Sequence, residues 1–109
     1  MVDYELDELR REFLAEAEEK AREIASTLEK EQTSEALDRL AYLAHQLKGA
    51  GGSYGYARIS SESAEIEKAA ERIVKGEKDG DIEVALQKHV AGLQAEIRRA
   101  LKELSTATS

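Results

Sequence analysis

One histidine in this chain stands in a segment whose residue types suit chemistry on an exposed imidazole. The segment runs from His45 to Gly55, with Lys48 three residues after the histidine and Gly49 four after it. Neutral imidazole, with an ordinary pKa of about 6.5, has a free lone pair near neutral pH and can act as a nucleophile. A lysine ammonium one turn away can offset the negative charge of an arriving phosphoryl group. The segment therefore predicts a nucleophilic His45 assisted by Lys48.

Helical periodicity around His45 predicts that its ring faces solvent. On a helix that turns about 100° per residue, His45 points about 140° away from the apolar stripe of its segment. That stripe consists of Leu37, Leu40, Leu43, Ala44, Leu47 and Gly51. Glycine inside a helix costs about 0.5–1 kcal/mol relative to alanine, so Gly49 and Gly52 on the histidine's own face indicate clearance for a bulky group. With Ala41 and Tyr42, they are the expected docking residues for a partner.

A helical hairpin would bring an acidic residue to the same ring. If the helices on either side of Gly55 and Tyr56 run antiparallel, His45, eleven residues before Tyr56, and Glu67, eleven after it, lie at similar heights. A carboxylate that accepts a hydrogen bond from Nδ1–H leaves Nε2 as the nucleophile. The alternative for Glu67 is one surface acid among many. His89, near the edge of another apolar stripe, is expected to be a structural or boundary residue.

Several other kinds of site are disfavoured by the residues that surround the histidines. A di-iron bundle would need Glu-x-x-His pairs, but Tyr42 and Leu86 stand three residues before His45 and His89. The glycines fit neither G-x-x-x-x-G-K-[ST] nor G-x-G-x-x-G, so they do not predict a nucleotide cradle. A small helical bundle also offers little room for a Ser-His-Asp triad with its oxyanion hole. We therefore expect neither a metal nor a cofactor on this chain.

Length and composition fit one small acidic domain spanning residues 1–109. The chain has 109 residues, no cysteine, 36% charged residues and a formal net charge of −7. An acidic balance disfavours nucleic acid and anionic membranes as partners, since both need basic patches. The absence of cysteine excludes a disulfide framework, and the first six residues do not resemble a signal peptide. We expect a cytoplasmic monomer whose partner is a protein.

Four amphipathic stripes with spacings of three and four residues predict an all-α, antiparallel up-down-up-down four-helix bundle. We expect Thr33 or Ser34 to cap the second helix and Asp81 to cap the fourth. Residues 105–109 are expected to form a frayed tail. The first stripe is Leu6, Leu9, Phe13, Ala17, Ala21, Ile24 and Leu28, and the second is the one that contains Leu47. The third is Ile59, Ser63, Ile66, Ala70 and Ile73, and the fourth is Ile82, Leu86, Val90, Leu93, Ile97, Ala100 and Leu104.

The chain resembles the histidine-containing phosphotransfer (HPt) domains of two-component phosphorelays. The family pattern of a histidine, a lysine three residues on and glycines four and ten residues on falls on His45, Lys48, Gly49 and Gly55. An acid or amide that faces the histidine in many members is matched by Glu67. One departure is Ala50, where the family often has serine, and we expect little effect from it. The resemblance covers essentially the whole chain.

The resemblance implies that His45 Nε2 exchanges a phosphoryl group with an aspartate of a response-regulator receiver domain. It implies that the receiver holds the Mg²⁺, that a sensor or hybrid histidine kinase stands upstream, and that the chain has no ATP site of its own. Two alternatives remain. The ending Gly52-Ser53-Tyr54-Gly55-Tyr56 is also similar to the phosphotransfer domain of chemotaxis-type kinases, whose donor is the kinase's own ATP-binding domain. The second alternative is a helical interaction module that docks without transferring phosphate.

Overall fold

A computed structural model describes residues 4–30, 32–77 and 79–108 of the chain. Within these ranges the regular secondary structure is helical throughout. The helices are α1 (Tyr4–Glu29), α2 (Ser34–Ser53), α3 (Ala57–Val74) and α4 (Gly80–Thr108). The structure confirms the predicted all-α class.

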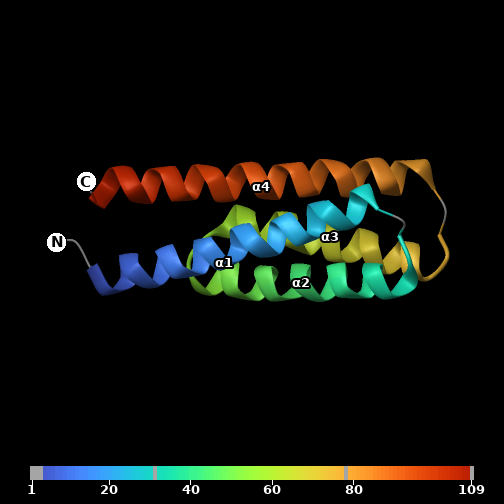
Figure 1. Ribbon diagram of the computed structural model, residues 1–109, viewed down its shortest axis with the longest axis horizontal. Helices are drawn as coiled ribbons and strands as arrows, with labels where there is room; N and C mark the ends of the chain where they lie inside the picture. Colours follow the sequence, from blue (N-terminus) through green and yellow to red (C-terminus); the bar gives the residue numbers. More distant parts are fainter. Residues whose placement is uncertain (1–3, 31, 78, 109) are drawn as a thin grey trace.

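The four helices form an antiparallel bundle in which each helix packs on the helices before and after it in the ring (Figure 1). Thus α1 and α3 each contact both α2 and α4. The bundle is elongated, with extents of 51 × 19 × 18 Å. In Figure 1 the first turns of α1 and the last turns of α4 continue past the α2–α3 turn, so these two helices form that end of the molecule.

The core is built from leucine, isoleucine and alanine, as the stripes predict. Ile59, Ile66, Leu93 and Ile97 are fully or almost fully buried. The first stripe is wrong at one residue, because Leu9 is 48% exposed while Leu14, outside the stripe, is completely buried. Leu9 stands at the edge of the buried face of α1, where it lines a surface hollow together with three acidic residues of the same helix, Glu5, Glu8 and Glu12.

The turn from α2 to α3 fixes how these two helices face each other. Gly55 has a φ of +85°, a left-handed conformation that glycine adopts without a steric penalty. The Tyr56 N–H donates to the Gly51 carbonyl over 2.7 Å, and the Gly55 N–H donates to the Gly52 carbonyl over 3.2 Å. These two bonds form a Schellman motif, which satisfies carbonyls left open at the helix end. The chain therefore reverses tightly, with Tyr54 closing α2 and Ala57 starting α3.

The observed helix ends match the predicted cap of α2 but differ from the predicted start and end of α4. Thr33 caps α2, because its Oγ1 accepts the Ala36 N–H over 3.1 Å. The predicted cap at Asp81 is wrong: α4 begins at Gly80, and Asp79 Oδ1 accepts the Asp81 N–H over 3.0 Å. Aspartate one position before the first helical residue can satisfy that amide, whereas Asp81 is already inside the first turn.

At its other end α4 continues through Thr108, beyond the predicted end at Leu104. The Thr106 hydroxyl donates to the Lys102 carbonyl over 2.9 Å. The expected tail of residues 105–109 is therefore helical as far as Thr108, and residue 109 lies outside the described residues.

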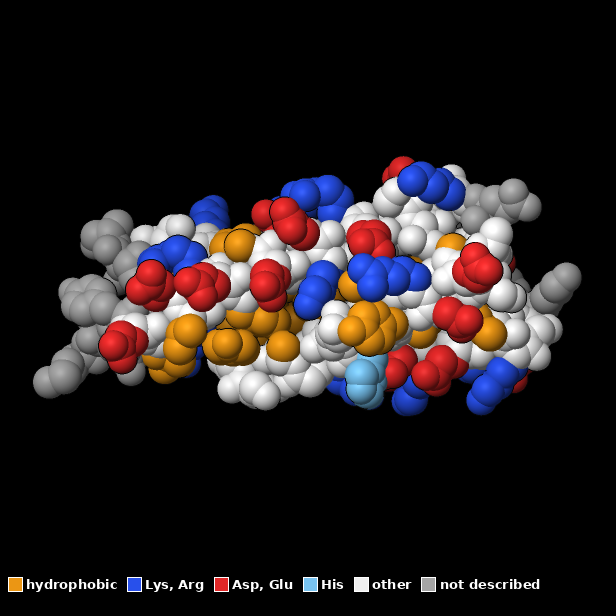
Figure 2. Space-filling view, turned by 60° about the horizontal axis from the view of Figure 1, so that its bottom comes forward, with side chains coloured by type: hydrophobic (Ala, Val, Ile, Leu, Met, Phe, Trp, Pro, Cys, Tyr) orange, Lys and Arg blue, Asp and Glu red, His pale blue; other side chains and the backbone are white. Residues whose placement is uncertain are grey.

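The surface mixes charges of both signs. Figure 2 shows one long face on which acidic and basic side chains stand on either side of a band of apolar ones. No described helix combines the length and the apolar composition that crossing a membrane requires.

Candidate functional site

The His45 side chain stands on the outer face of α2, 62% exposed to solvent. This exposure confirms the orientation predicted from the helical stripe. Its Nδ1 atom lies 2.8 Å from Oε2 of Glu67 on α3. Glu67, the acidic residue that the antiparallel hairpin predicts, therefore lies beside the ring, and Nε2 is the nitrogen left for a reaction partner.

Glu67 also contacts the lysine of the site. Its Oε1 accepts a hydrogen bond from Lys48 Nζ over 2.7 Å, so one carboxylate holds both His45 and Lys48. The Glu67 side chain is only 15% exposed, and burial by itself would raise the pKa of its carboxyl group. Hydrogen bonds from Lys48 and His45 outweigh this effect, and the Glu67 pKa lies below its ordinary value of 4.5. Glu67 is therefore an anion at neutral pH.

The charge of Glu67 determines which ring nitrogen carries a proton. An ionised carboxylate has no hydrogen to donate and can only accept. At 2.8 Å, His45 Nδ1 must therefore be the donor, whether the ring is neutral or protonated. In the neutral ring the lone pair is then on Nε2, which points away from Glu67. This arrangement presents a nucleophilic nitrogen to solvent in a fixed ring orientation.

Close packing between α2 and α3 supports this geometry. A Cβ atom added to Gly51 would lie 3.1 Å from the Ser60 backbone nitrogen and 3.2 Å from Ile59 Cγ2, so a larger residue there would require α3 to move away by a few tenths of an ångström. The Ser60 hydroxyl donates to the Lys48 carbonyl over 2.8 Å. These contacts fix α3 against the part of α2 that carries the site.

The residues predicted for clearance and docking lie around the histidine in different ways. A Cβ atom on Gly49 would meet nothing within 4 Å, and one on Gly52 would meet only Ser60 Oγ at 3.8 Å. Packing within the chain therefore requires glycine at neither position. Tyr42 is 52% exposed, whereas Ala41 is partly buried and packs against the core. Ala41 thus offers a partner less surface than its spacing from His45 indicates.

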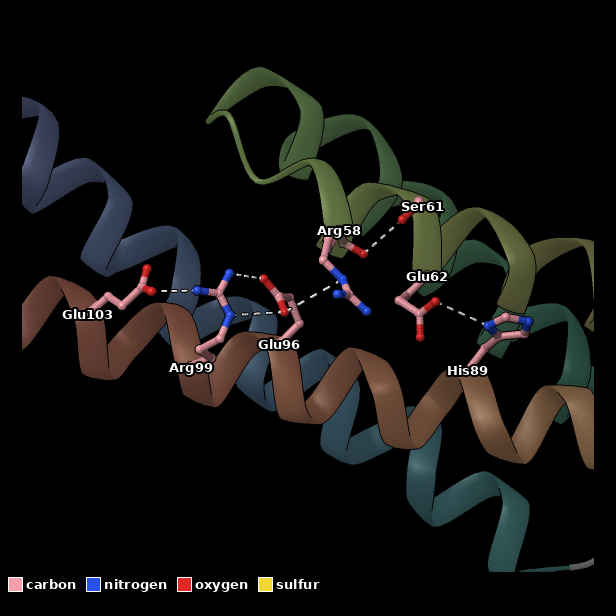
Figure 3. Close-up of polar contacts among 7 residues, drawn as sticks. All are labelled: Arg58, Ser61, Glu62, His89, Glu96, Arg99 and Glu103. Atoms are coloured by element: carbon pink, nitrogen blue, oxygen red, sulfur yellow. Dashed lines mark hydrogen bonds and ion pairs between the residues drawn. The ribbon is translucent and has the colours of Figure 1, made fainter.

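The second histidine also pairs with a glutamate, but in another groove. Figure 3 shows His89 on α4 facing Glu62 on α3, with 3.2 Å between Nδ1 and Oε1. A Cβ atom on Gly92 would lie 1.9 Å from Glu62 Oε2, so this glycine leaves room for the carboxylate to lie across α4. The His89 side chain is 26% exposed, less than half the fraction of His45. This position fits the boundary role predicted for it.

Two contacts near the site were not predicted. Ser60 lies opposite Gly52, and both stand four residues from Tyr56, so the symmetry argument used for Glu67 could have found it. The amide of Gln46 donates to the Tyr42 hydroxyl over 2.9 Å, a pairing at the i,i+4 spacing. Among the described residues, no three or more histidine, aspartate or glutamate side chains lie together in a way that could hold a metal ion.

Comparison with known proteins identifies the family. The family model described as Hpt domain matches residues 8–107, which include the His45 segment and every residue of the four core stripes except Leu6. No curated protein and no solved structure matches the chain. Since the family model covers far more than half of the sequence, the chain belongs to the Hpt domain family, whose members take part in histidine phosphotransfer in two-component systems.

Proposed function

We propose that this protein carries a phosphoryl group on His45 Nε2 and exchanges it with an aspartate of a response-regulator receiver domain. The observation that carries the proposal is the 2.8 Å contact between His45 Nδ1 and Glu67 on a ring that is 62% exposed. A nucleophile that reacts inside another protein's active site has to protrude from its own surface. It must also keep one orientation, and Glu67 supplies that constraint.

The chemical step needs only groups that the two proteins hold. The Nε2 lone pair attacks phosphorus of the receiver's aspartyl phosphate, an N–P bond forms, and the P–O bond to the aspartate breaks with its electron pair on the carboxylate. Nε2 has no proton to lose, and Nδ1 keeps its own. Positive charge develops on the ring during attack, and the Glu67 carboxylate stabilises it. The reverse step returns the phosphoryl group to an aspartate.

Lys48 has a separate role in this proposal. Its ammonium is one helical turn from His45 and 38% exposed, so it can turn from Glu67 toward phosphoryl oxygens while the group is transferred. The Mg²⁺ that phosphoryl transfer commonly uses is expected on the receiver, and this chain is expected to bind no cofactor. His45, Lys48 and Glu67 come from two helices of one chain, which supports a monomer as the active unit. We place the reaction in the cytoplasm, with a sensor or hybrid histidine kinase upstream.

The proposal is tested by phosphate transfer from a phosphorylated receiver domain. The wild-type protein should take up label that is labile in acid and stable in alkali, as a phosphohistidine is. His45→Gln should take up none, and His89→Gln should match the wild type. Label that persists in His45→Gln, or that maps to His89, would contradict the assignment. Transfer from a kinase ATP-binding domain but from no receiver would favour the chemotaxis-type alternative, and no transfer from either would favour a docking module.

A further inference from the structure

A second site candidate lies in the groove between α1 and α4, away from the α2–α3 face that carries His45. A cleft of about 120 Å³ opens there. Its lining residues are Glu18, Ala21, Arg22, Gln94, Ile97 and Arg98. Ala21 and Ile97 belong to the buried core and form an apolar floor, while the longer polar side chains come from both helices.

The charges at this cleft are not balanced within the chain. Arg98 makes no hydrogen bond or ion pair with any residue that the structure describes, and residues 94, 95, 101 and 102, its neighbours along the helix, include no acid. Arg22 has one distant partner, Glu18, at 3.9 Å. Two arginines and one glutamate leave a local charge of +1 in a chain with a net charge of −7.

Two other arginines of the surface differ from Arg98 in this respect. Arg99 forms ion pairs with both Glu96 and Glu103, and Figure 3 shows its guanidinium between the two carboxylates. Arg39 is similarly held by Glu23 at 2.9 Å. Unlike these residues, Arg98 has all its donors available at the edge of a cleft.

We propose that the α1–α4 cleft binds one small oxyanion, a phosphate or a carboxylate group. Guanidinium groups are the side chains best suited to oxyanions, because their donors match two oxygens at once. The cleft volume corresponds to about four liquid water molecules of about 30 Å³ each. Sites for drug-sized ligands and cofactors usually occupy about 300–1,000 Å³, so a single small group fits the cleft and a nucleotide does not.

Each polar residue of the cleft has a distinct part in this binding. Arg98 supplies an unpaired cation, and the Gln94 amide supplies a neutral donor on the same helix face, four residues away. Arg22 closes the opposite side by exchanging its long contact with Glu18 for the bound anion. Glu18 opposes binding, since its carboxylate repels the anion and competes for Arg22. The site therefore predicts opposite effects for removing a positive and a negative side chain.

The test is an NMR titration of the full chain with inorganic phosphate and, separately, with acetate, at constant ionic strength. All titrations use the His45→Gln variant. An anion that binds near Lys48 then cannot change the NMR signals by altering the protonation of the His45 ring. We expect saturable shifts at the side chains of Arg22, Gln94 and Arg98. The phosphate series reports a phosphate site and the acetate series a carboxylate site, and saturation in either supports the proposal.

Four variants separate specific binding from general attraction. Arg98→Gln should weaken binding of the anion at least tenfold, and Arg22→Gln should weaken it severalfold. Glu18→Gln should strengthen binding severalfold. Arg99→Gln is the matched control, since it removes the same charge from the adjacent position, and its effect should stay below twofold. Shifts that do not saturate, or equal weakening by Arg98→Gln and Arg99→Gln, would overturn the proposal. Circular dichroism of these surface variants checks that the fold is retained.

Discussion

His45 and Glu67, which lie 22 positions apart in the sequence, meet across the α2–α3 groove with 2.8 Å between Nδ1 and Oε2. The second oxygen of the same carboxylate holds Lys48 at 2.7 Å. One acid thus links the proposed nucleophile to the cation that is proposed to assist it. Substitutions at these three side chains, and in the packing that holds them in place, should have separable effects.

Glu67→Ala and Glu67→Gln distinguish the charge of the acid from its hydrogen bond. Glutamine can still accept from Nδ1–H through its amide oxygen but cannot stabilise positive charge on the ring. A hydrogen bond to a charged group contributes about 1.5–3 kcal/mol when buried and less in water, so we expect roughly tenfold slower transfer for Glu67→Ala. Glu67→Gln should lie between alanine and wild type. Nitrogen-15 NMR of His45 should show the Nε2–H tautomer increasing in Glu67→Ala, and an unchanged tautomer balance would remove Glu67 from the site.

The depressed pKa of Glu67 predicts a pH-dependent contribution to stability. A carboxyl group whose folded pKa lies below its unfolded value stabilises the fold above the unfolded pKa, and this contribution is lost as pH falls through the folded pKa. The ordinary value is 4.5. Glu67→Gln should therefore cost at most roughly 1.5 kcal/mol at pH 7, and the difference from wild type should shrink below pH 4.5. Urea unfolding of the wild type and of Glu67→Gln between pH 7 and pH 3 measures this difference in the free energy of unfolding. A difference that stays constant over this range would mean that the charge of Glu67 does not stabilise the fold.

Lys48→Ala should affect the phosphoryl group more than the resting imidazole. Without the ammonium, one cation that offsets phosphoryl charge is missing, and we expect transfer to slow by about tenfold. Because Glu67 still accepts from Nδ1–H, the tautomer of the unmodified His45 should change little. Single-turnover transfer and the His45 NMR spectrum measure the two effects. Lys48→Arg, which keeps the charge, is the control, and wild-type transfer by Lys48→Ala would exclude the proposed role.

Gly51 and Gly52 are adjacent, yet substitutions should affect them in opposite ways. Gly51→Ala should destabilise the fold despite the better helix propensity of alanine, because its Cβ would press on the Ser60 backbone at 3.1 Å. A Cβ atom on Gly52 would meet only the Ser60 hydroxyl, at 3.8 Å, and the position faces outward, so the stability of Gly52→Leu should be unchanged or should rise by up to about 1 kcal/mol. The leucine should nevertheless reduce transfer at least tenfold by obstructing the docked receiver. Thermal unfolding and transfer rates measure both, and full activity of Gly52→Leu would mean that the partner approaches elsewhere.

Replacing each of two serines of α3 by alanine should change the stability of the fold in opposite directions. Ser63 is completely buried, and its hydroxyl has no partner among the described residues, so Ser63→Ala should stabilise the protein by about 1 kcal/mol. Ser60 donates to the Lys48 carbonyl, so Ser60→Ala should destabilise it by about 1 kcal/mol. Urea denaturation of both variants measures the direction and size of each change in the free energy of unfolding. Destabilisation by Ser63→Ala would indicate that the buried hydroxyl has a partner.

The sequence was sufficient to predict the helices, most of the core and the meeting of His45 with Glu67. These features depend on helical periodicity and on the length of one turn, both of which are visible in the residues. It was insufficient where the answer depends on how neighbouring helices pack. Leu9 has the spacing of its stripe, but it stands at the edge of the buried face of α1, which is centred on Leu14, Ala17 and Ala21. The Gly51 contact depends in the same way on the distance between two helix axes, which periodicity does not specify.

The tight turn at Gly55 has a consequence for chain-length changes. If one residue is inserted there and becomes part of α3 while the turn keeps its conformation, the rest of α3 is displaced by about 1.5 Å along its axis and rotated by about 100° relative to α2. Glu67 would then face away from His45, although no residue of the pair had changed. Related sequences with an insertion or deletion in this turn would have to draw the histidine's partner from a different position on α3. Loop length is therefore as much a determinant of this site as the identity of its side chains.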